Sequence, residues 1–142
     1  ADIIGLSDTT GCANPGQIKR MFRRLRGEIG VENIAGAHLH NTRGQGLANV
    51  VAALDVDVTT FDSSLGGLGG CPFAPGATGN IVTEDLVFML EAMGLHTGID
   101  LDKLIATREV LLTGLPDEVI YGNVPESGLP KGFTYASGRN TK

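Results

Sequence analysis

The pattern of apolar and polar residues at the start of the chain predicts a buried strand followed by an amphipathic helix. A short apolar run over residues 3–6 predicts the strand. The apolar residues beyond it repeat at the helical spacing i, i+3, i+4, i+7: Ile18, Met21, Phe22 and Leu25. Asn14 suits the N-cap of this helix and Pro15 its first position. Gly27 or Gly30 can end it.

The same order of elements recurs further along the chain. Residues 34–39 predict a second strand, residues 44–54 a second helix and residues 56–61 a third strand. A short strand is expected at residues 80–82, directly before a helix that begins at Thr83. Such a succession of strand–loop–helix units implies a parallel α/β sheet, in which the chemistry lies at the carboxyl ends of the strands.

The C-terminal third predicts one more helix and then a tail. Residues 101–112 have a helical pattern with Asp100 near the N-cap, and the prolines and glycines from residue 116 predict an irregular tail. About four βα units amount to half of an eight-stranded barrel. Such a half leaves two parallel sheet edges open, so we expect the isolated chain to be oligomeric or poorly stable. The chain also opens directly in a strand-like run, from which we expect a preceding segment.

Composition and charge narrow the classes of protein. With 42% hydrophobic and 19% charged residues in 142, the chain is typical of a soluble domain. The net charge of −5 argues against nucleic-acid binding, and no apolar run approaches the roughly 18 residues of a membrane span. Two cysteines, Cys12 and Cys71, do not resemble a secreted disulfide framework, so we interpret both as reduced thiols of an intracellular protein.

The sharpest local motif is the pair of histidines at the end of the second predicted strand. His38 and His40 are two residues apart, so both side chains point to the same face of the strand. Both imidazoles could therefore bind one metal ion. Two hydrogen-bonded, structural histidines at a strand end are the alternative, and the motif alone leaves both open.

A glycine-dense stretch over residues 66–80 is too long for a simple connection. Glycines allow unusual backbone dihedrals and let a loop close over a ligand. The stretch is not a phosphate-binding P-loop, because no Gly-Lys-Ser/Thr ends it. Cys71 in its middle is either an accessible thiol that exchanges a proton or an inert residue in a turn.

Three further polar residues follow predicted strands. Asp8 is a candidate metal-site or acid–base carboxylate, although the local sequence alone favours capping of the turn at residues 10–11. Asp62 also follows a predicted strand and is a candidate of the same kind. Hydrogen bonds to Ser63 or Ser64 explain it equally well. Arg43 comes just after the histidine pair and is placed to bind an anionic ligand.

Together these segments resemble the C-terminal half of the 3-hydroxy-3-methylglutaryl-CoA (HMG-CoA) lyases, a family of metal-dependent TIM barrels. The resemblance spans residues 3–112. It rests on Leu6-Ser7-Asp8-Thr9, His38-Leu39-His40-Asn41-Thr42-Arg43-Gly44, Leu47-Ala48-Asn49, Asp62-Ser63-Ser64, the stretch 66–80 and Thr83-Glu84-Asp85-Leu86. The stretch 66–80 is the most specific, since related isopropylmalate-synthase-type enzymes share the histidine pair but not Gly70-Cys71-Pro72-Phe73.

The resemblance implies roles for particular residues. By it, His38, His40 and Asn80 are ligands of a divalent ion, Mg²⁺ or Mn²⁺, a choice consistent with mixed nitrogen and oxygen ligation. Cys71 is the catalytic cysteine of the loop and Asp8 a catalytic carboxylate beside the metal. The resemblance also implies that Glu84 supports Asn80 without itself binding the metal. Asn41 departs from the Asp that many members carry after the second histidine.

The implied reaction is a retro-Claisen cleavage of HMG-CoA to acetoacetate and acetyl-CoA. The alternatives are a related metal-dependent aldolase or acyl-CoA lyase, and a catalytically incomplete half-barrel. An acyl-CoA substrate is expected, but neither nucleic acid nor membrane. The implied location is the cytoplasm for a bacterial protein and the mitochondrial matrix for a eukaryotic one.

The resemblance also implies an organisation of the chain. Residues 1–115 would form the C-terminal half of the barrel and residues 116–142 the tail. The family's N-terminal half carries an Arg-Asp pair that supplies a further metal ligand and a catalytic arginine. Expected partners are therefore that half or a second copy of the chain, and a homo-oligomer is expected.

Overall fold

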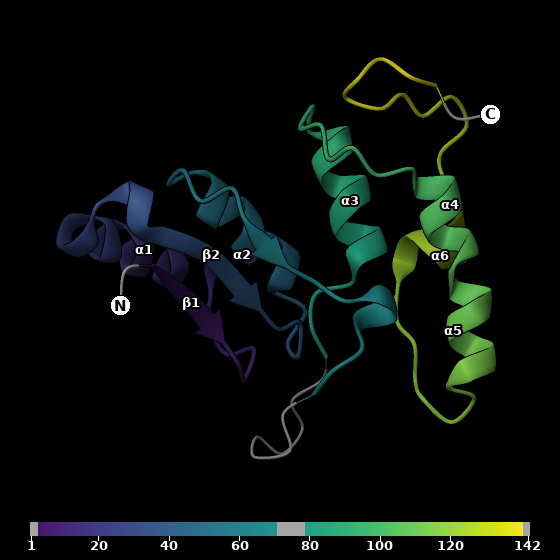
Figure 1. The fold of residues 1–142 in the computed structure, drawn as a ribbon, viewed down its shortest axis with the longest axis horizontal. Helices are drawn as coiled ribbons and strands as arrows, with labels where there is room; N and C mark the ends of the chain where they lie inside the picture. Colours follow the sequence, from purple (N-terminus) through teal and green to yellow (C-terminus); the bar gives the residue numbers. More distant parts are fainter. Residues whose placement is uncertain (1–2, 71–78, 141–142) are drawn as a thin grey trace. The chain divides into compact units, whose positions relative to one another are not determined.

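The computed structural model describes residues 3–70 and 79–140, and the chain divides into two compact units (Figure 1). The first unit comprises Ala1–Ser64 with Gly69–Ile81, and the second comprises Leu65–Leu68 with Val82–Lys142. The expected tail therefore belongs to the same unit as the helices that precede it. The chain passes from one unit to the other between residues 64 and 65, between 68 and 69, and between 81 and 82.

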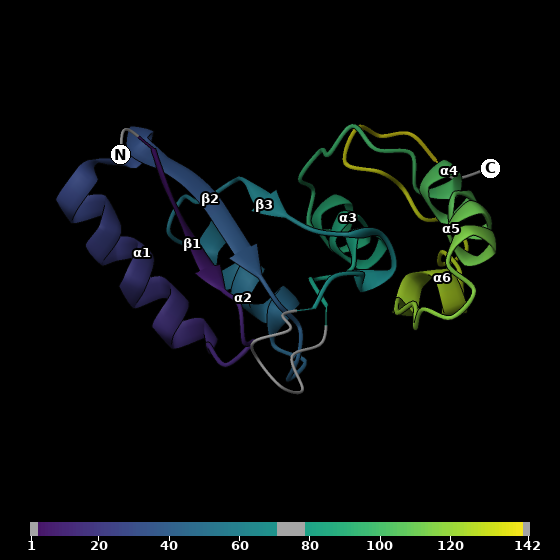
Figure 2. The ribbon, with the colours of Figure 1, turned by 60° about the horizontal axis from the view of Figure 1, so that its bottom comes forward.

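The first unit is a parallel sheet with helices packed on it (Figure 2). Its three strands, in the order β1-β2-β3, are β1 (Ile4–Asp8), β2 (Ile34–Leu39) and β3 (Phe61–Asp62). All pairings are parallel, as predicted. The connecting helices α1 (Pro15–Ile29) and α2 (Gly46–Leu54) pack on each other and on β2, and a 3-10 turn, η1 (Val31–Asn33), precedes β2.

The start of α1 confirms the prediction from its sequence. The Asn14 side chain accepts a hydrogen bond from the Gln17 amide at 3.0 Å, and the Gln17 side chain accepts one from the Asn14 amide at 3.0 Å. This reciprocal capping box satisfies two amides that a helix N-terminus leaves without partners. Phe22 is buried in the core, whereas Met21, at the edge of the same apolar stripe, is half exposed.

Three predicted elements differ in the structure. The third strand is confined to β3, and Val56 and Val58 are buried in the segment that joins α2 to β3. The strand expected at residues 80–82 is reduced to isolated bridge residues, among them an antiparallel bridge between His40 and Asn80. The expected helix at 101–112 is broken at Thr107, whose hydroxyl donates to the Leu104 carbonyl at 2.6 Å. Such a local side-chain bond competes with regular helix geometry.

The second unit is a helical assembly built around α3. Its elements are η2 (Leu65–Gly67), α3 (Thr83–Ala92), α4 (Leu101–Ala106), α5 (Arg108–Gly114) and α6 (Asn123–Ser127), the last lying in the expected irregular tail. Val87, Leu101 and Tyr135 form its core, and the Tyr135 hydroxyl accepts a hydrogen bond from the Leu101 amide at 2.9 Å. The end of the tail is thus packed on α3 and α4.

Helix α3 presents three buried carboxylates to the segments around it. Asp85 accepts hydrogen bonds from the amides of Asn123 and Val124 at 3.0 and 2.8 Å, which satisfies the N-terminus of α6. Glu84, the residue before Asp85, is completely buried. Each carboxylate replaces its lost hydration with backbone amides, the arrangement that buried charges require.

The third carboxylate, Glu91, joins the α3–α4 connection to the C-terminal tail. It accepts from the Thr97 amide and hydroxyl at 2.6 and 2.7 Å and from the Ala136 amide at 2.8 Å. Burial by itself raises the pKa of Glu91, but the hydrogen bonds from Thr97 and Ala136 and the nearby His96 outweigh it. The pKa therefore lies below its usual value of 4.5.

Replacing Glu91 by Gln is expected to destabilise the protein at pH 7 by about 1.5–3 kcal/mol, the contribution of hydrogen bonds to a charged group. A lowered folded-state pKa contributes stability above the unfolded value of 4.5 and loses it as the pH falls through the folded value. Urea unfolding from pH 7 to pH 3 should therefore show the two stability curves converging below about pH 4.5. The exposed Glu109→Gln is the control. A difference that stays constant down to pH 3 would contradict the prediction.

Candidate metal site

The histidine pair is brought together at the carboxyl end of β2. The Nε2 atoms of His38 and His40 lie 3.2 Å apart, and their ring centroids are separated by 5.2 Å. Two nitrogens bound to one ion at about 2.1 Å and at roughly a right angle lie about 3.0 Å apart. The two side chains therefore converge at the spacing that a shared ion requires. His40 is buried, and His38 is partly exposed.

The other ring nitrogen of His38 faces a carboxylate. His38 and Asp62 are register partners in the parallel pairing of β2 and β3, and His38 Nδ1 lies 3.2 Å from Asp62 Oδ2. Register partners on adjacent strands place their side chains on the same face. His38 thus stands between a carboxylate at Nδ1 and the second imidazole at Nε2.

Asn80 lies next to the pair because the chain returns to β2 after the glycine-dense stretch. The Ile81 amide donates to the Leu39 carbonyl at 3.1 Å, and the Asn41 amide donates to the Gly79 carbonyl at 3.3 Å. These bonds set Asn80 beside His40, with its side-chain oxygen buried. Gly69, at φ +98°, allows this approach, because a Cβ there would lie 2.9 Å from Asn80 Nδ2.

The donors present fit a divalent ion with mixed ligation. Two imidazole nitrogens converge, and an amide oxygen is held on the adjoining segment, a set that suits Mn²⁺ and tolerates Mg²⁺. Over residues 3–70 and 79–140, no group of three or more His, Cys, Asp or Glu side chains could hold an ion. A metal site at His38 and His40 therefore needs Asn80, or ligands from outside the described residues, to complete it.

Asp8 is engaged by the loop that follows β1. Its Oδ1 accepts from the Cys12 amide and its Oδ2 from the Ala13 amide, both at 3.0 Å. Asp8 thus fills the turn-capping role that the sequence left open, and its catalytic role stays a prediction. The exposed Cys12 contributes its backbone amide to this arrangement.

Arg43 also holds the loop that follows β1. Its Nη1 donates to the Thr10 carbonyl at 3.0 Å and the Gly11 carbonyl at 3.5 Å. Asn49, which the sequence gave no reason to single out beyond the resemblance, donates to the Ala13 carbonyl at 2.9 Å. The loop after β1 is therefore tied to the β2–α2 connection through Arg43 and to α2 through Asn49, and anion binding by Arg43 stays a prediction.

The departure at Asn41 has a local explanation. The Asn41 side-chain oxygen accepts a hydrogen bond from the Gly46 amide at 2.9 Å, at the start of α2. Asn and Asp both offer an oxygen for such a bond, so the substitution preserves this contact. Gly46 is required there, since a Cβ would lie 2.4 Å from the Ile81 side chain.

Cys71 lies outside the described residues, so its role stays a prediction. Glu84 is completely buried, and its carboxylate contacts the Gly66 amide at 3.1 and 3.2 Å and Arg108 Nη1 at 2.8 Å. These contacts anchor the start of the glycine-dense stretch, and support of Asn80 by Glu84 stays a prediction.

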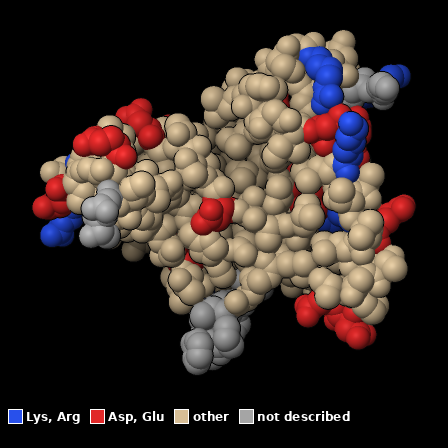
Figure 3. Space-filling model, viewed as in Figure 1, with Lys and Arg blue, Asp and Glu red and all other residues tan. Residues whose placement is uncertain are grey.

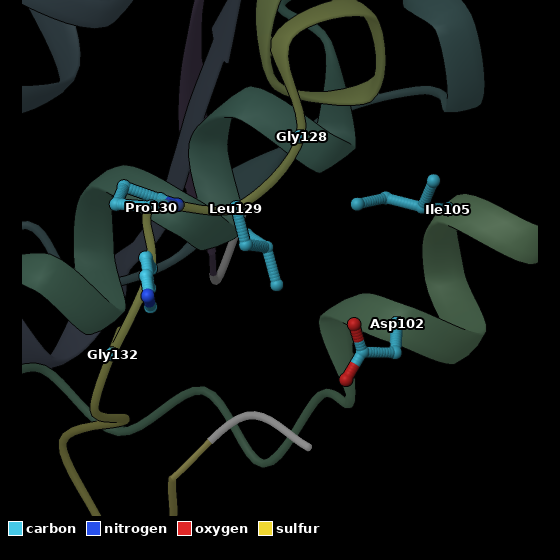
Figure 4. A pocket seen from close by; sticks show the side chains of 7 residues that line it. Asp102, Ile105, Gly128, Leu129, Pro130 and Gly132 are labelled. Atoms are coloured by element: carbon cyan, nitrogen blue, oxygen red, sulfur yellow. The ribbon is translucent and has the colours of Figure 1, made fainter.

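A cavity of about 530 Å³ lies in the second unit, between α4 and the tail (Figure 4). Asp102 and Ile105 project from α4 toward Leu129 and Pro130, and Lys131 contributes the other charge. None of the predicted site residues lines it. The cavity is open to solvent and offers one charge of each sign, so it defines no ligand class.

On the face shown in Figure 3, the described Lys and Arg side chains form no continuous basic patch, and blue and red lie near each other. Among the helices described, none is long and apolar enough to cross a membrane.

Parallel strands joined by helices, with polar side chains gathered at the strand ends, are the architecture of part of a TIM barrel. An Acinetobacter baumannii HMG-CoA lyase, solved with coenzyme A and 3-methylmalate, matches with a TM-score of 0.85 and 48% identity over 93% of this chain. The model of the HMGL-like family matches residues 1–111. The chain belongs to the HMGL-like family.

Curated relatives support the same assignment. The mitochondrial hydroxymethylglutaryl-CoA lyase of Homo sapiens is 50% identical over 112 residues, which are 79% of this chain and 34% of the relative. The lyase YngG of Bacillus subtilis is 48% identical over 106 residues, 75% of this chain and 35% of the relative. The chain thus spans about a third of these curated relatives' length, and 43% of the A. baumannii structure.

Proposed function

We propose that this chain supplies the metal-binding strand ends and the catalytic loop of an enzyme that cleaves HMG-CoA to acetoacetate and acetyl-CoA. The observation that carries the proposal is the 3.2 Å approach of His38 Nε2 and His40 Nε2 at the end of a parallel strand. The support from relatives is their name, hydroxymethylglutaryl-CoA lyase, at about half identity.

The metal-binding residues of the proposed enzyme are His38, His40 and Asn80, with further ligands outside this chain. Bound there, Mg²⁺ or Mn²⁺ would supply Lewis-acid polarisation of the substrate's hydroxyl and a neighbouring oxygen. The role of the chain is to hold the two imidazoles on one face of β2 and the amide oxygen beside them. Preorganised ligands spare the enzyme the entropy of assembling them for each substrate.

The bond that breaks joins C2 and C3 of the substrate. Loss of the proton from the C3 hydroxyl forms the carbonyl of acetoacetate, and the electron pair of the broken bond passes to the acetyl-CoA enolate. We assign Cys71 as the donor that protonates the enolate carbon. We assign the Asp8 carboxylate, which is held by two backbone amides at the end of β1, as the acceptor of the hydroxyl proton.

The test is metal-dependent cleavage by the protein at its full natural length. Release of acetyl-CoA and acetoacetate should require Mn²⁺ or Mg²⁺ and stop after chelation. Cys71→Ala should lower kcat by about 10²–10⁴-fold, the usual contribution of a positioned proton donor. Cys12→Ala is the matched control, because Cys12 is the other cysteine of the chain, and it should leave kcat unchanged.

Three outcomes would contradict parts of the proposal. Undiminished cleavage by Cys71→Ala would remove this residue as the proton donor. Cleavage of a 2-hydroxy-4-keto acid but not of HMG-CoA would favour a related aldolase. Binding of the metal with no turnover of either substrate would favour a catalytically incomplete half-barrel.

A further inference from the structure

We infer that Asp62 is a positioning residue, which holds His38 in the tautomer and orientation that direct its Nε2 toward the ion. The inference rests on the proposed function, because it gives the histidine pair its role as metal ligands.

The geometry around His38 assigns a different task to each ring nitrogen. Nδ1 lies 3.2 Å from Asp62 Oδ2, and Nε2 lies 3.2 Å from His40 Nε2. A neutral imidazole carries one proton, and a carboxylate is only an acceptor, so the proton belongs on Nδ1. This leaves the Nε2 lone pair free for a metal ion, the arrangement in which a carboxylate orients a histidine ligand.

The backbone fixes this contact. His38 and Asp62 are direct register partners of β2 and β3, so their side chains lie next to each other on one face of the sheet. His40, two residues further along, forms a bridge with Asn80, whereas the pairing of β2 with β3 ends at His38 and Asp62. Asp62 therefore orients the partly exposed histidine of the pair, while burial restrains the other.

Energetics separate a positioning role from a structural one. The Asp62 side chain is 71% exposed and that of His38 is 36% exposed, so their contact contributes at most about 1 kcal/mol to folding. Loss of an outer partner of a histidine ligand, in contrast, typically weakens metal binding by about 10–100-fold. Variants at Asp62 should thus fold normally and differ in how they bind metal.

The first experiment measures Mn²⁺ affinity by titration calorimetry on the full-length protein. Asp62→Leu, which removes the acceptor, is expected to bind about 10–100-fold more weakly than wild type. Asp62→Asn keeps an acceptor oxygen and should recover part of the loss. Asp55→Leu, which removes an exposed carboxylate paired with Lys19 in the same unit, should bind as wild type does.

The second experiment measures the tautomer of His38 in metal-free protein by ¹H–¹⁵N NMR of the imidazole ring at pH 8. Wild type should carry its proton on Nδ1, and Asp62→Leu should show a mixture or the Nε2–H form. This measurement does not depend on metal binding. Wild type that binds no Mn²⁺ but shows Nδ1–H would overturn the proposed metal site and keep the positioning by Asp62. Equal Mn²⁺ affinity and equal tautomers in wild type and Asp62→Leu would overturn the inference alone.

Discussion

Replacing Arg108 by Met is expected to destabilise the protein by about 3–5 kcal/mol, because it leaves a buried charge without its partner. Glu84 is completely buried, and Arg108, whose side chain is only 12% exposed, contacts it at 2.8 Å. The same guanidinium donates to the Tyr121 carbonyl at 2.8 Å. Denaturant unfolding at pH 7 measures the effect through the midpoint and slope of the transition.

Lys19→Met provides the matched control for the loss of a cation. Lys19 pairs with Asp55 at 2.5 Å, but both side chains are substantially exposed, so the expected loss is at most about 1 kcal/mol. The double variant Arg108→Met/Glu84→Gln should recover part of the stability, since it removes the uncompensated charge as well. Similar losses for Lys19→Met and Arg108→Met would refute the argument from burial.

The effect of Arg108→Met should also reach the glycine-dense stretch. The Gly66 amide donates to the Glu84 carboxylate, and the Gly66 carbonyl accepts from the Tyr121 amide at 2.8 Å. Both backbone polar groups of Gly66 are therefore hydrogen-bonded. Gly66 adopts φ +60°, which suits glycine. Hydrogen exchange at the Gly66 amide should therefore accelerate in Arg108→Met and stay unchanged in Lys19→Met.

Replacing His40 by Ala is expected to weaken Mn²⁺ binding by more than about 100-fold and to abolish the proposed lyase activity. Loss of an outer partner alone typically costs about 10–100-fold, and His40 is expected to be a direct ligand. Its Nε2 lies 3.2 Å from that of His38, and the residue is buried. Calorimetry with Mn²⁺ and the release of acetyl-CoA measure the two effects separately.

His96→Ala is the control for this variant. His96 is the third histidine of the chain, it lies after α3, and its side chain is 61% exposed. It should retain the metal affinity and the activity of wild type. The proposed metal site would be refuted by a His40→Ala protein of unchanged stability that binds Mn²⁺ with wild-type affinity. Stability is compared through the denaturant midpoint of unfolding.

The sequence by itself determined the elements whose signals are local. The cap at Asn14, the second strand at residues 34–39 and the start of α3 at Thr83 all appear where the pattern predicted them. The shared face of His38 and His40 also follows from the period of a strand, which two residues suffice to define. The parallel α/β class followed from the repetition of strand and helix, whereas the barrel was implied by the family resemblance.

Only the tertiary structure decided which partner each polar side chain takes. Asp62 faces His38 across two strands, Arg43 reaches carbonyls 32 and 33 residues away, and Glu84 meets Arg108 from another helix. The break at Thr107 and the brevity of β3 likewise differ from the periodic pattern. Such contacts join residues distant in the chain, and a local pattern of apolar and polar positions carries no information about them.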